Sequence, residues 1–118
     1  MSNRVVITGV GTINSLGHSV SEYTDSLKKG VCGIDHISHF DTEGYSCRIA
    51  AEVKDPDFSG ILDPKELRRT SRFITFALKA AIEALNHSGL AITDDNANDI
   101  GVEIGSGIGG IEVLEQTT

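Results

Sequence analysis

The stretch from residue 71 to residue 88 constrains the fold more than any other part of the sequence. Its apolar residues cover most of the circumference of a helix. One side carries Phe73, Ala77, Ala80, Ala81, Ala84 and Leu85, and it is widened by Ile74, Leu78 and Ile82. The polar stripe consists of Arg72, Thr75, Lys79, Glu83 and Asn86. A helix with so little polar surface is largely buried, so we expect 71–88 to be a buried helix that ends at Gly89.

The first thirty residues predict a strand, a glycine turn and a helix. Residues 4–8, "RVVIT", have the β-branched character of a strand, and "GVG" at 9–11 indicates a tight turn. Ser19 and Glu22 form a capping-box pattern at the start of the next helix. Gly30 stands where a left-handed residue ends such a helix.

Further elements follow at intervals along the chain. Residues 31–46 show no period and are expected to be a loop, whereas 48–53 and 99–105 are candidate strands. Asp63 and Pro64 are typical of a helix start, and another helix is expected from Gly110. Strands separated by helices predict an α/β architecture with a parallel component. Since parallel sheets usually need several strands, we expect 1–118 to be the incomplete front portion of a larger domain.

Composition narrows the function classes. The chain has 118 residues, a formal net charge of −7 and 39% hydrophobic residues. The acidic balance argues against a nucleic-acid binder, and no apolar run is long enough to span a membrane. Cys32 and Cys47 fit no disulfide framework or metal site, and only Arg48 could activate a thiol nearby. We expect a cytoplasmic protein with reduced cysteines and no metal.

Four basic residues are clustered in this acidic chain. Lys65, Arg68, Arg69 and Arg72 are spaced i, i+3, i+4, i+7, so they share one face if the helix from Pro64 continues that far. One interpretation is a solvated helical face. The other is a docking site for an acidic macromolecule, because clustered cations steer encounter with an oppositely charged surface.

The stretch "VEIGSGIGGIE" at 102–112 has three interpretations. Gly105, Gly107 and Gly110 match the dinucleotide-binding pattern, but they lie late in the chain. A second interpretation is close packing, with Ile108 projecting as a single large apolar side chain among glycines. A third interpretation, a tightly packed turn that binds no ligand, is also compatible with the sequence.

Several motifs resemble one known family in order and spacing. They are "RVVITGVGTINSLG", "HFDTEGY", "DPKELRRTSRF" and "IGSGIGGIE". From residue 4 onward the chain resembles the N-terminal part of β-ketoacyl-acyl-carrier-protein synthases, and especially the type II elongating enzyme of bacterial fatty acid synthesis. One departure is "NSLG" at 14–17, where many members have "SPLG" or "SPVG", so that Ser15 stands in place of a proline.

The resemblance implies a thiolase-like α/β fold, of which this chain is the N-terminal part of the first half, a mixed sheet flanked by helices. It also implies a homodimer that uses no cofactor and condenses acyl and malonyl thioesters of acyl carrier protein. The family nucleophile is a cysteine in a "T-A-C-x-[ST]-G" context that neither Cys32 nor Cys47 has. We therefore expect no catalytic residue within 1–118, and no condensation by these residues alone.

Recognition residues do carry over from the resemblance. Lys65, Arg68 and Arg69 align with the basic residues that dock acyl carrier protein, whereas Arg72 falls outside that pattern. Ile108 aligns with the isoleucine that gates the acyl pocket, and the glycines around it, including Gly107, are expected to shape an acyl tunnel. Two rival hypotheses stay open: a non-catalytic partner such as a chain-length factor, and a nucleotide-binding module.

Overall fold

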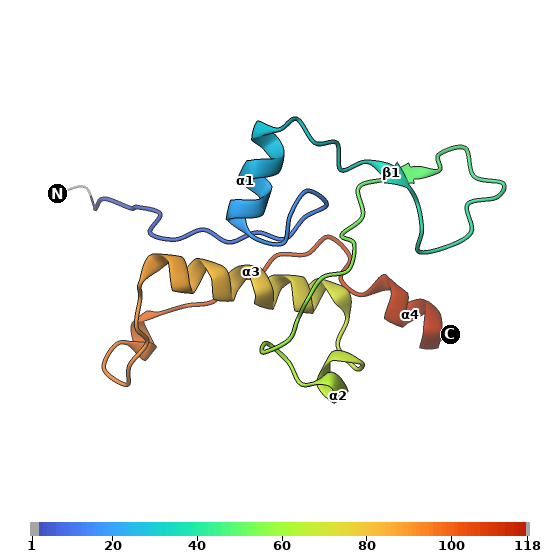
Figure 1. The fold of residues 1–118 in the computed structure, drawn as a ribbon. Helices are drawn as coiled ribbons and strands as arrows, with labels where there is room; N and C mark the ends of the chain where they lie inside the picture. The colour runs from blue at the N-terminus through green and yellow to red at the C-terminus, as the bar shows by residue number, and fades with distance from the viewer. Residues whose placement is uncertain (1–2, 118) are drawn as a thin grey trace. The chain divides into compact units, whose positions relative to one another are not determined.

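The structure is a computed structural model that describes residues 3–117, with side chains described as far as residue 115. It divides into two compact units (Figure 1). One unit combines Met1–Gly11 with Phe58–Thr118, and the other is Thr12–Asp57. Each unit is described by itself below.

Helix α1 (Val20–Lys28) is the main element of the unit Thr12–Asp57. The Ser19 hydroxyl accepts a hydrogen bond from the Glu22 amide at 3.2 Å, as the sequence predicts. The Glu22 carboxylate reaches one residue further back than expected and accepts from the His18 amide at 2.7 Å. Gly30 has the predicted left-handed conformation, with φ of 67°.

The same unit contains a short antiparallel hairpin. Strand β1 (Asp35–His36) pairs with strand β2 (Ile49–Ala50), and Asp35 lies opposite Ala50. The strand predicted over 48–53 is therefore reduced to two residues. The prediction of an unbroken loop over 31–46 is wrong, because β1 lies within it.

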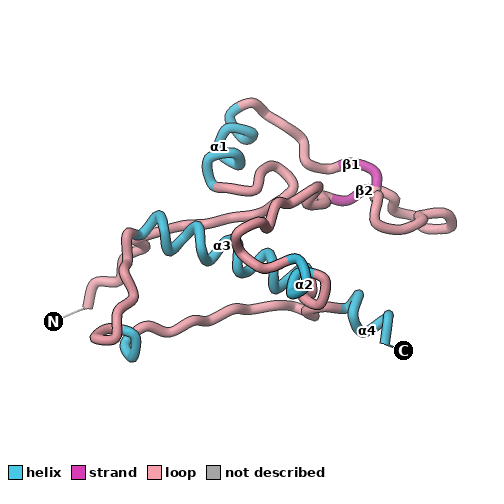
Figure 2. The backbone as a smooth tube through the Cα atoms, turned by 60° about the horizontal axis from the view of Figure 1, so that its bottom comes forward, coloured by secondary structure: helices cyan, strands magenta, loops and turns pink. Residues whose placement is uncertain are grey.

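Helix α3 (Arg72–Ser88) is the long element of the other unit (Figures 1 and 2). Helix α2 (Pro64–Leu67) precedes it, and the 3₁₀ helix η1 (Ala97–Asp99) and helix α4 (Ile111–Thr117) follow it. Gly89 ends α3 in the left-handed conformation, with φ of 67°. The segment after η1 runs back along α3 towards its N-terminal end (Figure 2).

The strands predicted at 4–8 and 99–105 are not formed: 4–8 and 100–105 have no ladder, and Asp99 belongs to η1. Among the described residues, the only sheet is the antiparallel pair of β1 and β2, so the parallel component is absent there. Val5 is 95% exposed and Val102 is 85% exposed. An extended segment becomes a strand only where a neighbour pairs with its backbone groups, and neither segment has such a neighbour in the described residues.

Gly9 and Gly11 serve a close approach and not the tight turn that the sequence predicts. A β-carbon built at Gly9 would lie 2.1 Å from the carbonyl oxygen of Ala84. The Val10 amide between the two glycines donates a hydrogen bond to Nδ1 of His87 at 3.2 Å. The glycines therefore let the N-terminal segment lie directly against the backbone of α3.

The prediction that α3 is buried is wrong for the described residues. Its one buried residue is Thr75, which is 2% exposed and which the sequence places on the polar stripe. The Thr75 hydroxyl donates to the Arg72 carbonyl at 2.8 Å, so the buried hydroxyl has a hydrogen-bond partner. Phe73, Ile74 and Ile82 on the apolar side remain partly exposed.

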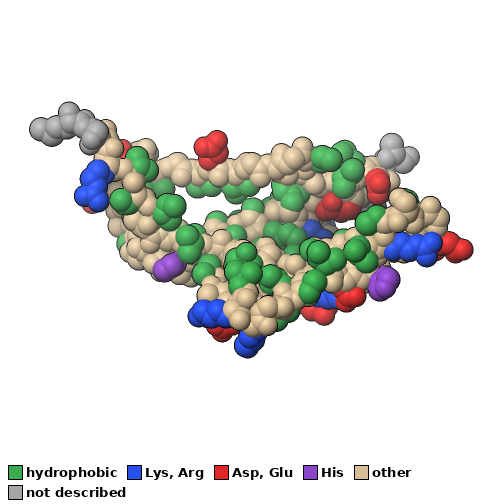
Figure 3. Space-filling view, turned by 90° about the horizontal axis from the view of Figure 1, so that it is seen from above, with side chains coloured by type: hydrophobic (Ala, Val, Ile, Leu, Met, Phe, Trp, Pro, Cys, Tyr) green, Lys and Arg blue, Asp and Glu red, His purple; other side chains and the backbone are tan. Residues whose placement is uncertain are grey.

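Large hydrophobic side chains are exposed in both units. Val6 is 65% exposed and Ile7 is 86% exposed in one unit, and Ile49 is 52% exposed in the other. Many hydrophobic side chains are visible on the surface in Figure 3. Each unit therefore has exposed apolar surface.

Candidate functional site

Helix α2 and the turn after it position the predicted docking residues Lys65, Arg68 and Arg69. The Asp63 carboxylate accepts hydrogen bonds from the amides of Lys65 at 2.7 Å and Glu66 at 2.9 Å. The Asp63 amide donates to Glu66 at 3.5 Å, which completes the capping box. The Nε of Arg68 donates to the Pro64 carbonyl at 3.0 Å, so the side chain lies along its own helix.

The helix from Pro64 does not continue to Arg72, so the condition for a shared face is not met. Helix α2 ends at Leu67, and α3 begins only at Arg72. The Thr70 hydroxyl donates to the Glu66 carbonyl at 2.7 Å and helps close the turn between them. The four cations therefore do not share one helical face.

Arg72 is set apart from the other three cations by its own contact. Its guanidinium lies over the ring of Phe76, 5.2 Å from the centroid. A cation in this position is attracted by the electron-rich face of the ring. The Phe76 ring in turn lies 6.1 Å from that of Phe58, which is buried.

The charges of Lys65, Arg68 and Arg69 are open to a partner. All three residues are exposed. The ion pairs of His39 with Glu52 and of Lys54 with Asp35 do not involve these three side chains. We call Lys65, Arg68 and Arg69 the basic cluster. Uncompensated exposed cations raise the rate of encounter with an acidic surface.

An open hollow of about 430 Å³ lies beside the basic cluster. Arg69 contributes to its lining, and so does Ile108 from the glycine turn. The other lining residues include Ser71, Phe73, Gly110 and Leu114. The structure thus brings one residue of the predicted docking set and one of the predicted acyl-pocket set to the same hollow.

The glycine turn at 105–110 is packed and hydrogen-bonded. The Gly109 amide donates to the Ser106 hydroxyl at 2.9 Å, and Gly109 has φ of 79°. A β-carbon at Gly110 would lie 2.5 Å from the Ser71 hydroxyl oxygen, so close packing requires glycine there. Gly107 has open space around it, and Ile108 is 73% exposed. An amide already bonded to Ser106 is not a free donor for a phosphate, which disfavours the nucleotide interpretation.

Glu112 joins this turn to the start of α3, and the sequence gives no signal for it. Its carboxylate accepts a short hydrogen bond from the Ser71 hydroxyl and a second from the Arg72 amide at 3.3 Å. The hydrogen bond from Ser71 is the main cause that lowers the pKa of Glu112 from its usual value. Ser71 and Arg72 lie 41 and 40 positions before Glu112 in the sequence, so a local sequence pattern does not reveal these contacts.

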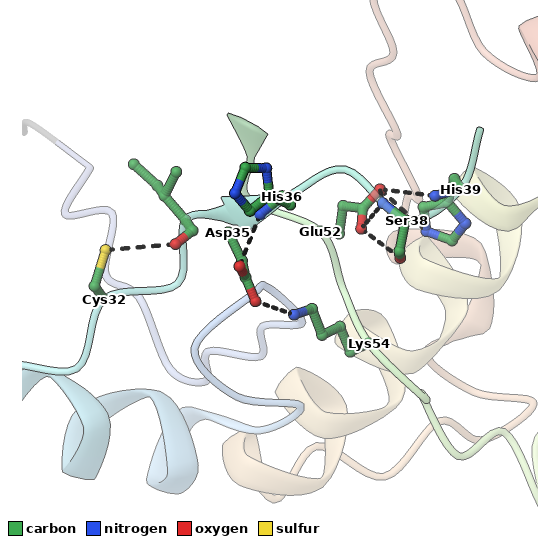
Figure 4. A network of polar contacts seen from close by, with 8 residues as sticks. Cys32, Asp35, His36, Ser38, His39, Glu52 and Lys54 are labelled. Carbon is green, nitrogen blue, oxygen red and sulfur yellow. Dashed lines mark hydrogen bonds and ion pairs between the residues drawn. The ribbon is translucent and has the colours of Figure 1, made fainter. Parts of the chain in front are cut away.

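A separate polar network lies at the hairpin of the unit Thr12–Asp57 (Figure 4). The Glu52 side chain is 8% exposed, and its carboxylate accepts from the amide and the hydroxyl of Ser38, at 3.0 Å and 2.7 Å, and from the His39 amide at 3.3 Å. These hydrogen bonds lower the pKa of Glu52, and the bond from the Ser38 hydroxyl has the largest effect. Lys54 pairs with Asp35 at 2.8 Å, and this hydrogen bond lowers the pKa of Asp35.

The cysteines lie in the same unit and are free and exposed. The Cys32 thiol points to the Ile34 carbonyl, and the Cys47 thiol to the Ile49 carbonyl. Arg48, the one candidate activator, donates to the Tyr45 carbonyl at 3.3 Å. No group of three or more metal-ligating side chains was found among the described residues. None of the helices described has the length and apolar character that crossing a bilayer requires.

Comparison with known proteins covers almost all of the chain. Residues 2–118 match the family model described as the N-terminal domain of beta-ketoacyl synthase. The chain is 46% identical over 112 residues to a 3-oxoacyl-(acyl-carrier-protein) synthase 2 of Synechocystis, covering 95% of this chain and 27% of that protein. It is 46% identical over 114 residues to the protein of the same name from Staphylococcus aureus strain N315, covering 97% of this chain and 28% of the relative.

A solved structure gives the fold. The chain superposes on "The ishigamide ketosynthase/chain length factor" with a TM-score of 0.76 and 33% identity, over 98% of this chain and 30% of that one. This likeness confirms the predicted thiolase-like fold class. The chain thus spans between a quarter and a third of the length of the proteins that it matches.

Proposed function

This chain belongs to the β-ketoacyl synthase family, and from that premise we propose that it is the N-terminal portion of an elongating condensing enzyme. The match of residues 2–118 to the family domain is the observation that carries the proposal. The uncovered apolar surface supports it, because the rest of a synthase would bury such surface.

The reaction is a decarboxylating Claisen condensation. A cysteine thiolate elsewhere in the synthase attacks the acyl thioester of acyl carrier protein, forms an enzyme thioester and releases the thiol of that carrier. Malonyl carrier protein then loses carbon dioxide, and the resulting carbanion attacks the thioester carbonyl and expels the thiolate. The products are a lengthened β-ketoacyl carrier protein, carbon dioxide and the free enzyme thiol. Donors aimed at the developing enolate oxygen stabilise the decarboxylation step.

The role that we assign to this chain is recognition. The basic cluster docks the acidic helix of acyl carrier protein, and its exposed, unpaired cations suit that partner. Ile108 and Gly107 form part of the acyl pocket. The hollow that Arg69 and Ile108 both line supports this pair of roles, because it brings a docking residue and an acyl-pocket residue together.

Two properties of the whole protein belong to the same proposal. We propose a cytoplasmic homodimer. The exposed free thiols of Cys32 and Cys47 suit a reducing compartment, and the uncovered apolar surface provides area for subunit contacts. No cofactor is required by the chemistry written above.

The second candidate is a non-catalytic partner of the same fold. It is favoured by one observation, the likeness to a solved structure titled as a ketosynthase and chain-length factor. The residue at the nucleophile position of the full-length protein distinguishes the two functions. A cysteine there indicates a condensing enzyme, and another residue indicates the non-catalytic partner.

The experiment is turnover by the full-length protein with acyl and malonyl carrier proteins, followed by mass spectrometry of the carrier. We expect β-ketoacyl carrier protein and released carbon dioxide. A protein that forms no product alone, but restores product when paired with a ketosynthase, would have the partner function instead.

A further inference from the structure

The start of α3 is capped by a residue from another element. Ser71 is the N-cap residue, but its side chain forms no capping hydrogen bond of the usual kind. Its hydroxyl donates instead to the Glu112 carboxylate on α4, which also accepts from the Arg72 amide at 3.3 Å. A carboxylate is well placed here, because the first amides of a helix lack partners within it and carry partial positive charge.

Contacts on the other side of Glu112 involve the glycine turn. Gly110 packs on Ser71, and a β-carbon at Gly109 would contact the Phe73 ring at 3.6 Å. Ser71 is 9% exposed, so the hydrogen bond to Glu112 lies in a shielded contact. The turn is therefore fixed at two places, by packing at 109–110 and by hydrogen bonds at 112.

This connection lies next to Ile108. Only three residues separate Ile108 from Glu112, and Ile108 is 73% exposed. Ile108, Ser71 and Gly110 line the same hollow. Where the Ile108 side chain stands in the hollow thus depends on how firmly the turn is held against α3.

We propose that Glu112 is a positioning residue that holds Ile108 in the hollow through its hydrogen bonds to Ser71 and to the Arg72 amide, and so sets the reach of the acyl pocket. The proposal rests on the proposed function, because it assumes that Ile108 lines an acyl pocket. Glu112 itself contacts no substrate in this account.

The test uses the full-length enzyme with a short and a long acyl primer on the carrier protein. Glu112→Ala is expected to lower kcat/KM for the long primer about fivefold, equivalent to ~1 kcal/mol, and to leave the short primer unaffected. A primer chosen to be too short to reach Ile108 serves as an internal reference. Glu112→Gln keeps a carbonyl oxygen that accepts both hydrogen bonds, so it should restore most of the long-primer activity.

Glu115→Ala is the matched control, since it removes the same charge from the same helix at an exposed position. Wild-type behaviour of this variant is expected. An equal loss with both primers, or no loss with either, would overturn the role of Glu112. If Glu112→Ala does not fold, Glu112→Asp decides, because the shorter side chain withdraws the carboxylate and should give the same selective loss.

The two proposals fail in different ways. If the wild-type enzyme extends neither primer, the proposed function is wrong. If the wild type extends both and the Glu112 variants match it, the proposed function stands and only the positioning role is lost.

Discussion

Gly11 lies so close to Ala80 that a β-carbon at position 11 would stand 2.0 Å from the Ala80 carbonyl oxygen. No carbon and oxygen atoms approach to that distance without a bond, so the backbone of one segment would have to move. The N-terminal segment and α3 therefore fit together only while position 11 is glycine.

Replacing Gly11 by alanine should destabilise the full-length protein by about 1–3 kcal/mol, the usual cost of overpacking a tight contact. The midpoint of thermal unfolding measures this. Gly101→Ala is the control, because a β-carbon at Gly101 meets nothing within 4 Å. Equal midpoints for the two variants would contradict the close approach.

The Glu52 network predicts an acid-sensitive loop between β1 and β2. The folded-state pKa of Glu52 is lowered by its hydrogen bonds, so its contribution to stability is complete above the unfolded-state pKa of about 4.3 and is lost as pH falls through the folded value. Hydrogen-exchange protection of residues 37–48, corrected for the intrinsic rate, should therefore fall below that pH in the full-length protein.

Glu52→Gln should remove most of this pH dependence and lower the protection at neutral pH, whereas Glu43→Gln in the same loop should behave as the wild type. Protection that falls equally with acid in the wild type and in Glu52→Gln would rule out Glu52 as the responsible group.

Ile108→Phe should shorten the acyl chains that the enzyme accepts. The larger ring occupies the hollow that Ile108 and Arg69 share, so long primers lose space and short primers do not. We expect at least a tenfold loss of kcat/KM for long primers, which corresponds to about 1.4 kcal/mol. Product lengths are read by mass spectrometry. Ile108→Val, which adds no bulk, is the control, and an unchanged length distribution with Ile108→Phe would exclude Ile108 from the pocket.

Local features of the fold were predictable because they depend on neighbours in the sequence. The capping residues Ser19 and Asp63 form the expected bonds within three positions, and Gly30 and Gly89 adopt the expected left-handed conformation. Caps of this kind need only the helix that they end.

Features that depend on distant partners were not predictable. Periodicity shows that α3 has a wide apolar side, but burial of that side requires other layers, which these residues do not supply. The same reason applies to the segments 4–8 and 99–105, which have the composition of strands and no partner strand among the described residues.

The candidate site was predicted in part. The residues of the basic cluster and Ile108 were named from the sequence, and their roles stay predictions. The sequence left open whether the helix from Pro64 reaches Arg72. In the structure α3 begins at Arg72, and Ser71, a favoured N-cap residue, marks its start. Glu112 was missed entirely, since its partners lie 41 and 40 positions away.

The basic cluster provides the last prediction. Lys65→Glu with Arg69→Glu should raise the KM of the full-length enzyme for carrier-bound substrate about tenfold or more at low salt, with kcat much less affected. The dependence of KM on salt should also weaken, because exposed charges act through a screened field. Lys28→Glu with Lys29→Glu makes the same charge change at exposed lysines outside the cluster and should leave KM unchanged.

The most direct measurement pairs the Lys65→Glu, Arg69→Glu enzyme with a carrier protein whose acidic helix residues are replaced by lysine. If these side chains receive the carrier, the reversed pair should recover most of the lost kcat/KM, while the reversed carrier should react poorly with the wild-type enzyme. If the reversed carrier gives the variant no recovery, the account of this chain as the carrier-docking part of a condensing enzyme is contradicted.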